Sequence, residues 1–481
     1  MMKRIFLILT VSVLFTHMGV AQNESDALRY AQTFPGGTAR FSAMAGSFGA
    51  LGGDFSSLSI NPAGIAIYRS SEFSITPSVN YSQVTSRYFN NREEDMKYNF
   101  NLNSLGLVFA IPLNNEGTQS GWQYFNIGLG FNRQNNFNNR WIAEGFNPEN
   151  SFMTSMLAQA NREGLGGLDP FSTGLAWDTY LLDYHDDYGF SADMPNGQVL
   201  QRRETTLSGS LNELVFSLGA NYGDRLYLGA SMGIPNLSYK EESVFGEEDR
   251  NDINPVFNSL TYTHNIRTRG SGFNLKLGAI IRVTDVIRLG GAFHTPTFFE
   301  LDDRYHSSMR ADLNLDVDTR FKRSPIGRFD YEINTPMKAV GSLGLVFGGR
   351  GLINIDYEYI DYTKTRLRHS EYLFTSENNR IKEAFTEQHN LRIGGELLLN
   401  PLIIRAGYAY YSSPYKPGVN DGQRSLIAAG IGIREGNYFI DFAYTYAFYS
   451  EDFFLYDLNN LKPVSRDFAS SAFRATVGWR F

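Results

Sequence analysis

The sequence predicts an all-β fold, a transmembrane antiparallel β-barrel of about 14 strands with an N-terminal hatch in its lumen. Three observations predict it: segments of alternating apolar and polar residues, many aromatic residues and glycines, and a polar average composition. The 481 residues include 28 Tyr, 37 Phe and 46 Gly, and the mean hydropathy is -0.29. Barrel strands, which alternate lipid-facing and lumen-facing residues, have this composition, whereas bundles of membrane helices do not.

The N-terminus indicates the compartment. Two basic residues, Lys3 and Arg4, precede an apolar run over 5–15, and small residues lead to an expected cleavage after Ala21. A membrane-spanning helix needs about 20 apolar residues, so this run is too short for an anchor. We therefore expect residues 1–21 to be a signal peptide and the mature chain to reach the outer membrane of a Gram-negative cell.

The alternation is clearest at the C-terminus, and it recurs over 269–283 and 438–449. A soluble β-sandwich also alternates. Aromatic residues near both ends of these segments, as in interfacial girdles, favour a membrane barrel. One face of the last segment consists of Phe473, Ala475, Val477, Trp479 and Phe481.

About fourteen strands can be assigned, an even number as expected for a single-chain barrel with both ends in the periplasm. Tight turns alternate with long polar loops, of which 136–206 is the longest. The barrel is expected over 72–481. The predicted strands are 72–84, 98–112, 122–135, 207–222, 225–240, 269–283, 287–300, 333–347, 352–364, 389–399, 402–413, 424–434, 438–449 and 470–481. The predicted tight turns lie at 222–224, 348–351, 400–401 and 435–437, and the predicted long loops at 86–97, 136–206, 241–268, 301–332, 365–388 and 450–469.

Residues 22–71 do not alternate and are expected to form the hatch, with a short helix near 25–34. A stretch rich in small residues over 44–53 leads to Asp54 and then to the group Asn61, Pro62, Ala63 and Gly64. An Asn side chain can close a turn with the backbone that follows it, and proline adds no amide donor that a buried segment must satisfy. These residues are therefore suited to irregular backbone inside a barrel.

This layout resembles the hatch of FadL/TodX-type transporters, the outer-membrane channels for long-chain fatty acids and other hydrophobic compounds. The resemblance covers the signal peptide, hatch, strand number and terminal Phe481, and in sequence it is specific only at Asn61-Pro62-Ala63-Gly64. It implies a fourteen-stranded monomeric barrel that takes up a hydrophobic small molecule by passive diffusion, gated by the hatch. It does not identify the substrate.

Charged residues on lumen-facing positions have two interpretations. They can hold the hatch by charge-assisted hydrogen bonds, or they can simply pair with each other across the barrel. These residues are Asp356, Glu358, Arg392, Glu396, Arg405, Asp441 and Arg474.

The longest loop contains the expected substrate-capture residues. Asn147-Pro148 is expected to cap a helix that ends at Gly164, and a second helix is expected from Ser172. Apolar side chains would line one face of each helix and form a groove for an acyl chain, although packing within the loop explains the same pattern. The candidate contacts are Phe152, Met153, Met156, Leu157, Trp177, Tyr180, Leu181 and Tyr184.

Release through the barrel wall requires a break in the strand ladder, and proline, which lacks an amide donor, suggests one at Pro77, Pro235 or Pro296. The main alternative function is a general diffusion porin or a structural barrel without a hydrophobic substrate. A TonB-dependent receptor would need a larger plug than residues 22–71 provide.

Other functional classes are disfavoured. The net charge of -7 is spread along the chain, which argues against nucleic acid. The chain has no Cys and only 7 scattered His, so we expect no cofactor, no metal site and no enzymatic activity. His294 and His306 lack a recognisable nucleophile. The acidic run that begins at Asp312 and includes Asp316 and Asp318 is more typical of a solvated strand than of a calcium site.

Overall fold

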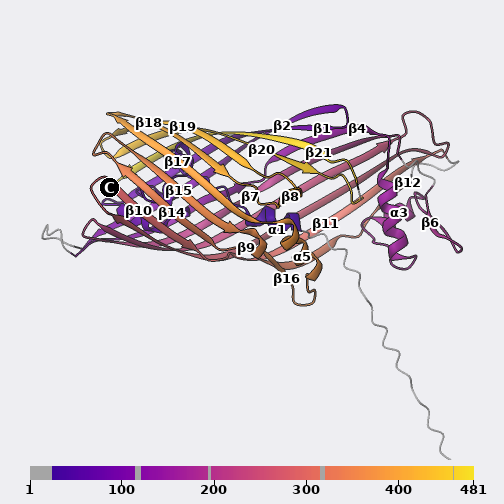
Figure 1. The fold of residues 1–481 in the computed structure, drawn as a ribbon, viewed down its shortest axis with the longest axis horizontal. Helices are drawn as coiled ribbons and strands as arrows, with labels where there is room; N and C mark the ends of the chain where they lie inside the picture. The colour runs from indigo at the N-terminus through magenta and orange to yellow at the C-terminus, as the bar shows by residue number, and fades with distance from the viewer. Residues whose placement is uncertain (1–23, 114–120, 193–196, 315–319, 459) are drawn as a thin grey trace, which may run out of the picture.

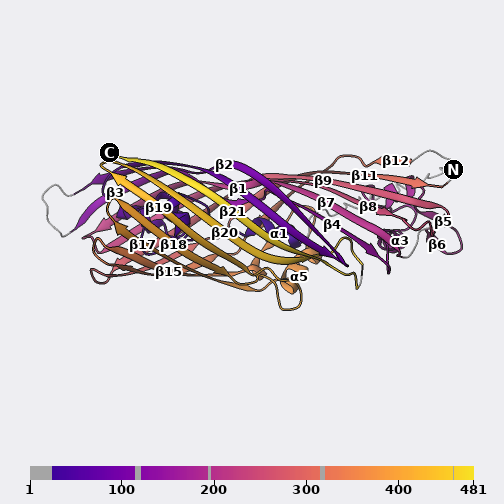
Figure 2. The same ribbon diagram turned by 90° about the horizontal axis from the view of Figure 1, so that it is seen from above.

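The computed structural model describes residues 24–113, 121–192, 197–314, 320–458 and 460–481. The expected signal peptide over 1–21 lies outside these residues, as do Asp316 and Asp318. Figures 1 and 2 show an elongated barrel in which the described hatch residues, from Glu24 onwards, lie inside the wall. The strand β1 (Glu72–Tyr88) pairs with the last strand, β21 (Val464–Arg480), so the sheet is closed.

In the described part of the chain the wall contains fourteen antiparallel strands, as predicted. Several of them are interrupted, so nineteen described segments make up the barrel sheet. The uninterrupted strands, besides β1 and β21, are β2 (Asn91–Pro112), β7 (Val199–Tyr222), β8 (Leu226–Glu248), β9 (Phe257–Arg282), β17 (Glu387–Leu399), β18 (Leu402–Tyr411), β19 (Arg424–Glu435) and β20 (Tyr438–Phe453). The interrupted strands are β3 (Trp122–Asn136) with β4 (Asn139–Asn147), β10 (Ile287–His294) with β11 (Phe298–Leu313), β12 (Arg320–Arg323) with β13 (Gly327–Asn334) and β14 (Lys338–Val346), and β15 (Gly351–Asp361) with β16 (Arg366–Arg368).

An apolar belt surrounds the outside of the barrel, because outward positions are Leu, Ile, Phe, Tyr or Trp while inward positions are mostly small or polar. On β9 and β11 the belt ends at Phe273 and Phe298, whose side chains are 43% and 52% exposed. The next outward residues are Ser271 and Glu300. This switch marks the boundary of the hydrocarbon layer on the loop side.

The predicted long loops are partly wrong, because several strands continue beyond the belt. Residues 86–97 belong to a β1–β2 hairpin, and β4 and the start of β7 lie in the predicted loop 136–206, so only 148–198 leaves the wall. Beyond the belt the outward residues of these strands are mostly polar or charged, while apolar residues such as Tyr239 and Ile266 face inward. The outward apolar pattern that identifies membrane strands is therefore lost. Figures 1 and 2 show β7, β8, β9 and β11 extending past the ends of β17–β21.

The predicted tight turns are confirmed. For example, β7 ends at Tyr222 and β8 begins at Leu226, and Gly223 and Asp224 between them have φ angles of 60° and 53°. Gly and Asp tolerate this left-handed conformation better than most residues.

The hatch segment folds into short helices within the lumen. They are α1 (Glu24–Ala31), α2 (Ala39–Ala43), and the 3-10 turns η1 (Phe55–Ser59) and η2 (Pro62–Ile67). Phe41, Phe48 and Leu51 form one buried apolar cluster with wall residues, and Phe55, Leu58 and Ile65 form another. Apolar packing therefore fixes the hatch within its small-residue stretch and on both sides of it.

The remaining helical elements lie at the loop end. They are α3 (Phe152–Glu163), α4 (Thr173–Asp178), α5 (Thr375–Ala384) and η3 (Tyr362–Lys364), together with the short strands β5 (Asp183–His185) and β6 (Gly189–Ser191). Among the described residues, no helix is both long enough and apolar enough to cross a membrane.

The predicted helix caps of the long loop need correction. Ser151, not Asn147, caps α3, because Asn147 is the last residue of β4 and its Oδ1 accepts from the amide of Glu149 at 3.0 Å. Gly164 ends α3, as predicted. The second predicted helical face is wrong, because α4 ends at Asp178 and Tyr180 has a left-handed φ of 59°.

Candidate functional site

Asn61 joins the hatch to itself and to the wall. Its Oδ1 accepts from the amide of Ala63 at 3.0 Å, which closes the turn at the start of η2. Its Nδ2 donates to the carbonyl of Gly49 at 2.7 Å and to that of Ala279, on β9, at 3.2 Å. Pro62 occupies the first position of η2, where an amide donor is not needed. The buried side-chain amide of Asn61 therefore forms three hydrogen bonds.

Two glycines allow the two halves of the hatch to touch. Gly53 donates its amide to the carbonyl of Gly64 at 3.0 Å. A Cβ added to Gly52 would lie 2.6 Å from the Cα of Gly64. The backbones can approach this closely only because neither residue has a side chain.

Lumen-facing charges serve both of the roles considered from the sequence. Asp356 accepts from the amides of Phe48 and Gly49 at 2.9 and 3.1 Å. Glu396 accepts from Nε of Arg40, in the hatch, at 2.9 Å and from Nε of Arg405 at 2.6 Å.

The other lumen charges pair across the wall, since Arg405 also binds Asp441 at 2.5 Å and Arg392 binds Glu358 at 3.2 Å. Arg474 donates to Thr445 at 2.9 Å. Two of the seven residues therefore hold the hatch directly, and the rest support the wall around it.

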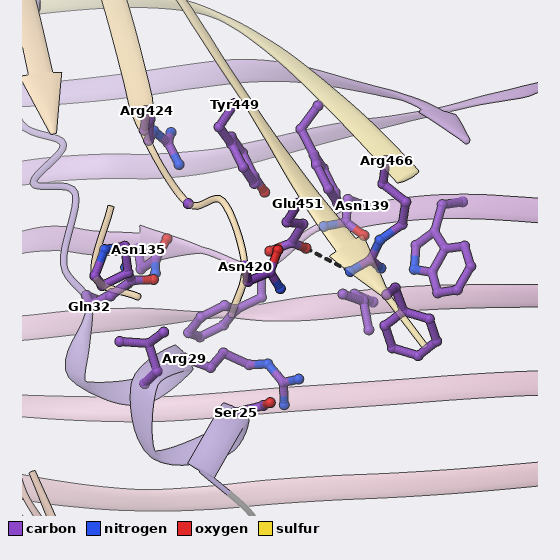
Figure 3. Close-up of a pocket in the computed structure, with 18 of the residues that line it drawn as sticks. Ser25, Arg29, Gln32, Asn135, Asn139, Asn420, Arg424, Tyr449, Glu451 and Arg466 are labelled. Carbon is purple, nitrogen blue, oxygen red and sulfur yellow. Dashed lines mark hydrogen bonds and ion pairs between the residues drawn. The ribbon is translucent and has the colours of Figure 1, made fainter. Parts of the chain in front are cut away.

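A cavity of about 270 Å³ lies between α1 and the wall on the loop side of the hatch. Figure 3 shows Arg29, Arg424 and Arg466 around it, with a dashed line joining Arg466 to Glu451. That ion pair measures 2.7 Å. Charges of both signs and aromatic rings line this outer cavity.

A second cavity of about 140 Å³ adjoins the first and shares Phe34, Arg424 and Tyr449 with it. We call it the inner pocket. Three cationic side chains line it, Lys97, Arg424 and Arg474, and no Asp or Glu is among its described lining residues. Nε of Arg424 and Nε of Arg474 are buried without a hydrogen-bond partner in the described part of the chain. The guanidinium of Arg424 lies 4.0 Å from the ring centroid of Phe34.

The wall beside the inner pocket is incomplete. The β2–β3 ladder ends at the pair Ser104 and Asn132, beyond which β2 pairs only with β1, and β3 and β4 pair with β7. We call the space between residues 91–103 and 133–140 the wall gap.

Between described residues of the wall, two side-chain contacts cross the wall gap. Lys97 donates to the carbonyl of Leu207 at 2.5 Å, and Arg140 lies 3.1 Å from Asp95. The hatch also lies along this edge, since Phe34 and Gly36 donate their amides to the carbonyls of Gln134 and Arg133 at 2.8 Å each. Side chains and the hatch, rather than a continuous strand ladder, therefore close the wall at this point.

The three prolines predicted to break the wall lie at irregularities smaller than the wall gap. The β1–β2 register shifts between Thr76 and Pro77, the β8–β9 ladder omits Pro235, and Pro296 lies between β10 and β11. The wall gap itself contains no proline. The sequence signal associated with it is the concentration of asparagines, whose polar side chains suit a strand edge without a partner. Those that line the inner pocket are Asn99, Asn135, Asn136, Asn138 and Asn139.

The predicted loop contacts are mostly buried. Phe152, Met153, Met156 and Leu181 belong to an apolar core at the loop end, and Leu157 and Tyr184 pack against it. Trp177 and Tyr180 are 37% and 54% exposed. Packing within the loop accounts for the first six side chains, and ligand contact stays a prediction.

A buried carboxylate holds the start of α3. Glu247, at the outer end of β8 and far beyond the apolar belt, accepts from the Ser151 hydroxyl, the Phe152 amide and the Gln201 amide group, each at 2.6 Å. Burial raises the pKa of Glu247 to about 7, against the opposing effect of these hydrogen bonds.

The chemistry-bearing side chains do not converge elsewhere in the described residues. No group of three or more His, Asp or Glu side chains there is arranged to hold a metal ion. His294 is buried and contacts the carbonyl of Ile60 at 2.9 Å, so it links β10 to the hatch.

The closed wall, apolar belt and folded lumenal hatch define a transmembrane barrel of the outer-membrane class. No family model and no curated protein matches the chain. Solved structures do match. A Pseudomonas aeruginosa FadL homologue is 14% identical with a TM-score of 0.59, covering 94% of this chain and 100% of the other. The Ralstonia pickettii toluene transporter TbuX is 14% identical with a TM-score of 0.51, covering 93% and 99%.

The Pseudomonas putida toluene transporter TodX matches over 94% of this chain and 100% of its own, with 12% identity and a TM-score of 0.52. The chain therefore has the FadL/TodX-type fold, a fourteen-stranded barrel with an N-terminal hatch.

Proposed function

We propose that the protein is a passive outer-membrane channel for hydrophobic or amphipathic small molecules, acting as a monomer. The observation that supports this most strongly is the folded hatch within a closed barrel, with two adjoining cavities on its loop side. A general diffusion porin would instead need an open aqueous lumen. The matched TodX and TbuX structures are described as toluene transporters, which supports a hydrophobic substrate here.

Within this class we propose a long-chain fatty acid rather than a neutral hydrocarbon. The inner pocket presents Lys97, Arg424 and Arg474 with no acidic residue among its described lining. Charged groups in a confined site are costly unless they are paired. A carboxylate head group would pair with these cations, whereas toluene, which is uncharged, would leave them without a counter-charge. The acyl chain would lie along Phe34, Tyr411 and Leu426, which line the same pocket.

The proposed route leads from the loop end through the outer cavity into the inner pocket and out through the wall gap. Opening the wall gap requires the Lys97–Leu207 and Arg140–Asp95 contacts to separate. Both are contacts of long side chains, which rearrange faster than a strand ladder. Rearrangement of the hatch around Asn61 would be the alternative exit.

Uptake of labelled palmitate by cells lacking their own fatty acid transporter tests this function. The intact protein is expected to restore uptake, and an Arg424→Gln/Arg474→Gln variant to lose most of it. The matched control is Arg250→Gln/Lys322→Gln, which removes two exposed cations that pair with Glu248 and Asp178.

Surface expression is measured for every variant. Equal uptake of palmitate and hexadecanol by the Arg424→Gln/Arg474→Gln variant and the intact protein would contradict the role of the cations. Uptake of neither compound, with entry of a small sugar, would favour the porin alternative.

A further inference from the structure

The outer face of the wall has an unusual row of like charges beyond the apolar belt. Lys240 of β8 lies opposite Arg267 of β9, Arg267 opposite Arg304 of β11, and Arg304 opposite Arg328 of β13. All four side chains are exposed. We call these four residues the cation row. Figure 2 shows β8, β9 and β11 running alongside one another towards the loop end.

Like charges directly opposite each other on neighbouring strands destabilise a sheet. Arg267, Arg304 and Arg328 form no ion pair with any residue that the structure describes, and Lys240 pairs only along its own strand with Glu242, at 2.5 Å. Asp302 and Asp330 lie one row nearer the membrane, opposite each other, yet neither is within 4.0 Å of these guanidinium groups. The acidic neighbours therefore form no ion pair with the row.

The fold itself does not require cations at these positions. The inward neighbours Ile266, Tyr305 and Phe329 belong to a buried apolar cluster that includes Tyr30 of α1, and they account for the packing. Polar uncharged residues on the outer face would leave that packing intact. An external anionic partner would explain why four adjacent strands each present a cation at the same level.

The height of the row indicates which partner. Arg267 lies six residues beyond Phe273, and Arg304 six beyond Phe298. At about 3.3 Å per residue and a strand tilt of about 40°, the row stands roughly 15 Å above the edge of the belt. Phospholipid headgroups extend only about 5–8 Å beyond the hydrocarbon. A headgroup that reaches the row must be larger, and it must be anionic.

We propose that the cation row binds phosphate groups on the saccharide headgroup of an outer-leaflet glycolipid. Arginine forms bidentate hydrogen bonds with phosphate, and three arginines spaced across adjacent strands can engage more than one phosphate. This site is independent of the transport route, since it lies on the outer face of the wall, opposite the lumen. It would order the glycolipid against the long side of the barrel.

The test measures binding of phosphorylated lipopolysaccharide to the full chain purified in neutral detergent. An Arg267→Gln/Arg304→Gln/Arg328→Gln variant is expected to bind roughly 100-fold more weakly, at about fivefold or more per cation near a membrane surface. The control Arg92→Gln/Arg250→Gln/Lys322→Gln removes the same charge from exposed residues paired with Glu94, Glu248 and Asp178. It is expected to bind like the intact protein.

Two further arms identify the ligand chemistry. Enzymatically dephosphorylated lipopolysaccharide should bind the intact protein as weakly as the phosphorylated form binds the row variant. Inorganic phosphate alone should not displace the lipopolysaccharide at concentrations at which the lipopolysaccharide itself saturates the protein. In lipid-free detergent the row variant should unfold at the same temperature as the intact protein or higher, because repulsion within the row is removed.

Equal loss of binding in the row variant and the control would reduce the effect to net charge and overturn the site. Undiminished binding by the row variant, or competition by inorganic phosphate as effective as that by the glycolipid, would overturn it as well. Arg304→Gln alone, at the centre of the row, is the milder variant should the triple substitution fold poorly, and it is expected to weaken binding about fivefold.

Discussion

Replacing Gly52 by alanine should destabilise the closed hatch. The structure gives two separate contributions to the loss of free energy. Gly52 has a φ of 62°, and alanine in the left-handed region costs about 1–2 kcal/mol. In addition, the new Cβ would lie 2.6 Å from both the Cα and the carbonyl oxygen of Gly64. Crowding of this kind in a packed interior costs about 1–3 kcal/mol more. The expected total is about 2–5 kcal/mol.

Gly53→Ala is the matched control. Its φ of 66° imposes the same backbone strain, but its added Cβ would meet only the side chain of Ile67, at 3.8 Å. Hydrogen exchange of the buried amides of Asn61 and Gly64 measures opening of the hatch. Exchange in Gly52→Ala should be about 5- to 150-fold faster than in Gly53→Ala, which corresponds to the crowding alone. Equal exchange in the two variants would refute the close approach of the two backbones.

Three further changes have defined outcomes. Asn61→Ala removes the turn closure and two backbone contacts, so hydrogen exchange in η2 should report a loss of about 1–2 kcal/mol. Arg40→Ala removes two hydrogen bonds to Glu396 and one to the carbonyl of Gly53 but leaves Glu396 paired with Arg405. The hatch should therefore lose at least about 1.5–3 kcal/mol, the value of a single charged hydrogen bond, as seen in its exchange rates. The pKa of Glu247 is raised to about 7 in the folded loop, so folding favours the protonated carboxyl. The stability of α3 should therefore fall as the pH rises from about 4.5 to 7 and then stay level. Protease sensitivity of α3 should follow that profile in the intact protein and lose it in Glu247→Gln, and greater protection at pH 8 than at pH 5 would contradict it.

The fold could be predicted from the sequence because contact with a membrane imposes a simple periodicity on the residues of each strand. Where one face of a strand contacts lipid, every second residue is apolar, so segments such as 269–283 were recognised. Beyond Phe273 the outward residues are polar, so the sequence predicts a loop over 241–268 where β9 in fact extends back to Phe257. Strand length outside the membrane is therefore invisible to an argument based on apolar alternation.

The candidate site was harder to predict from the sequence, because it depends on pairing between segments that are distant along the chain. Asn61 was recognised from a local motif, and its turn is local. The inner pocket combines Lys97, Arg424 and Arg474 from three separate strands, and the wall gap arises where β2 and β3 diverge. Neither has a signal in the spacing of neighbouring residues. The sequence does not single out Ser151 as the helix cap, because Asn147-Pro148 offers an equally good local signal.

The central claim, that an amphipathic acid leaves the inner pocket through the wall gap, is tested most directly by closing that gap. The chain contains no Cys, so an Asn99→Cys/Asn138→Cys variant, with one residue on each side of the gap, can be joined by a short cleavable bifunctional reagent. Uptake of labelled palmitate is measured before bridging, after it and after cleavage, with each single-cysteine variant treated in parallel. Bridging is expected to abolish uptake and cleavage to restore it. Undiminished uptake through a completely bridged protein would show that the substrate leaves by another route.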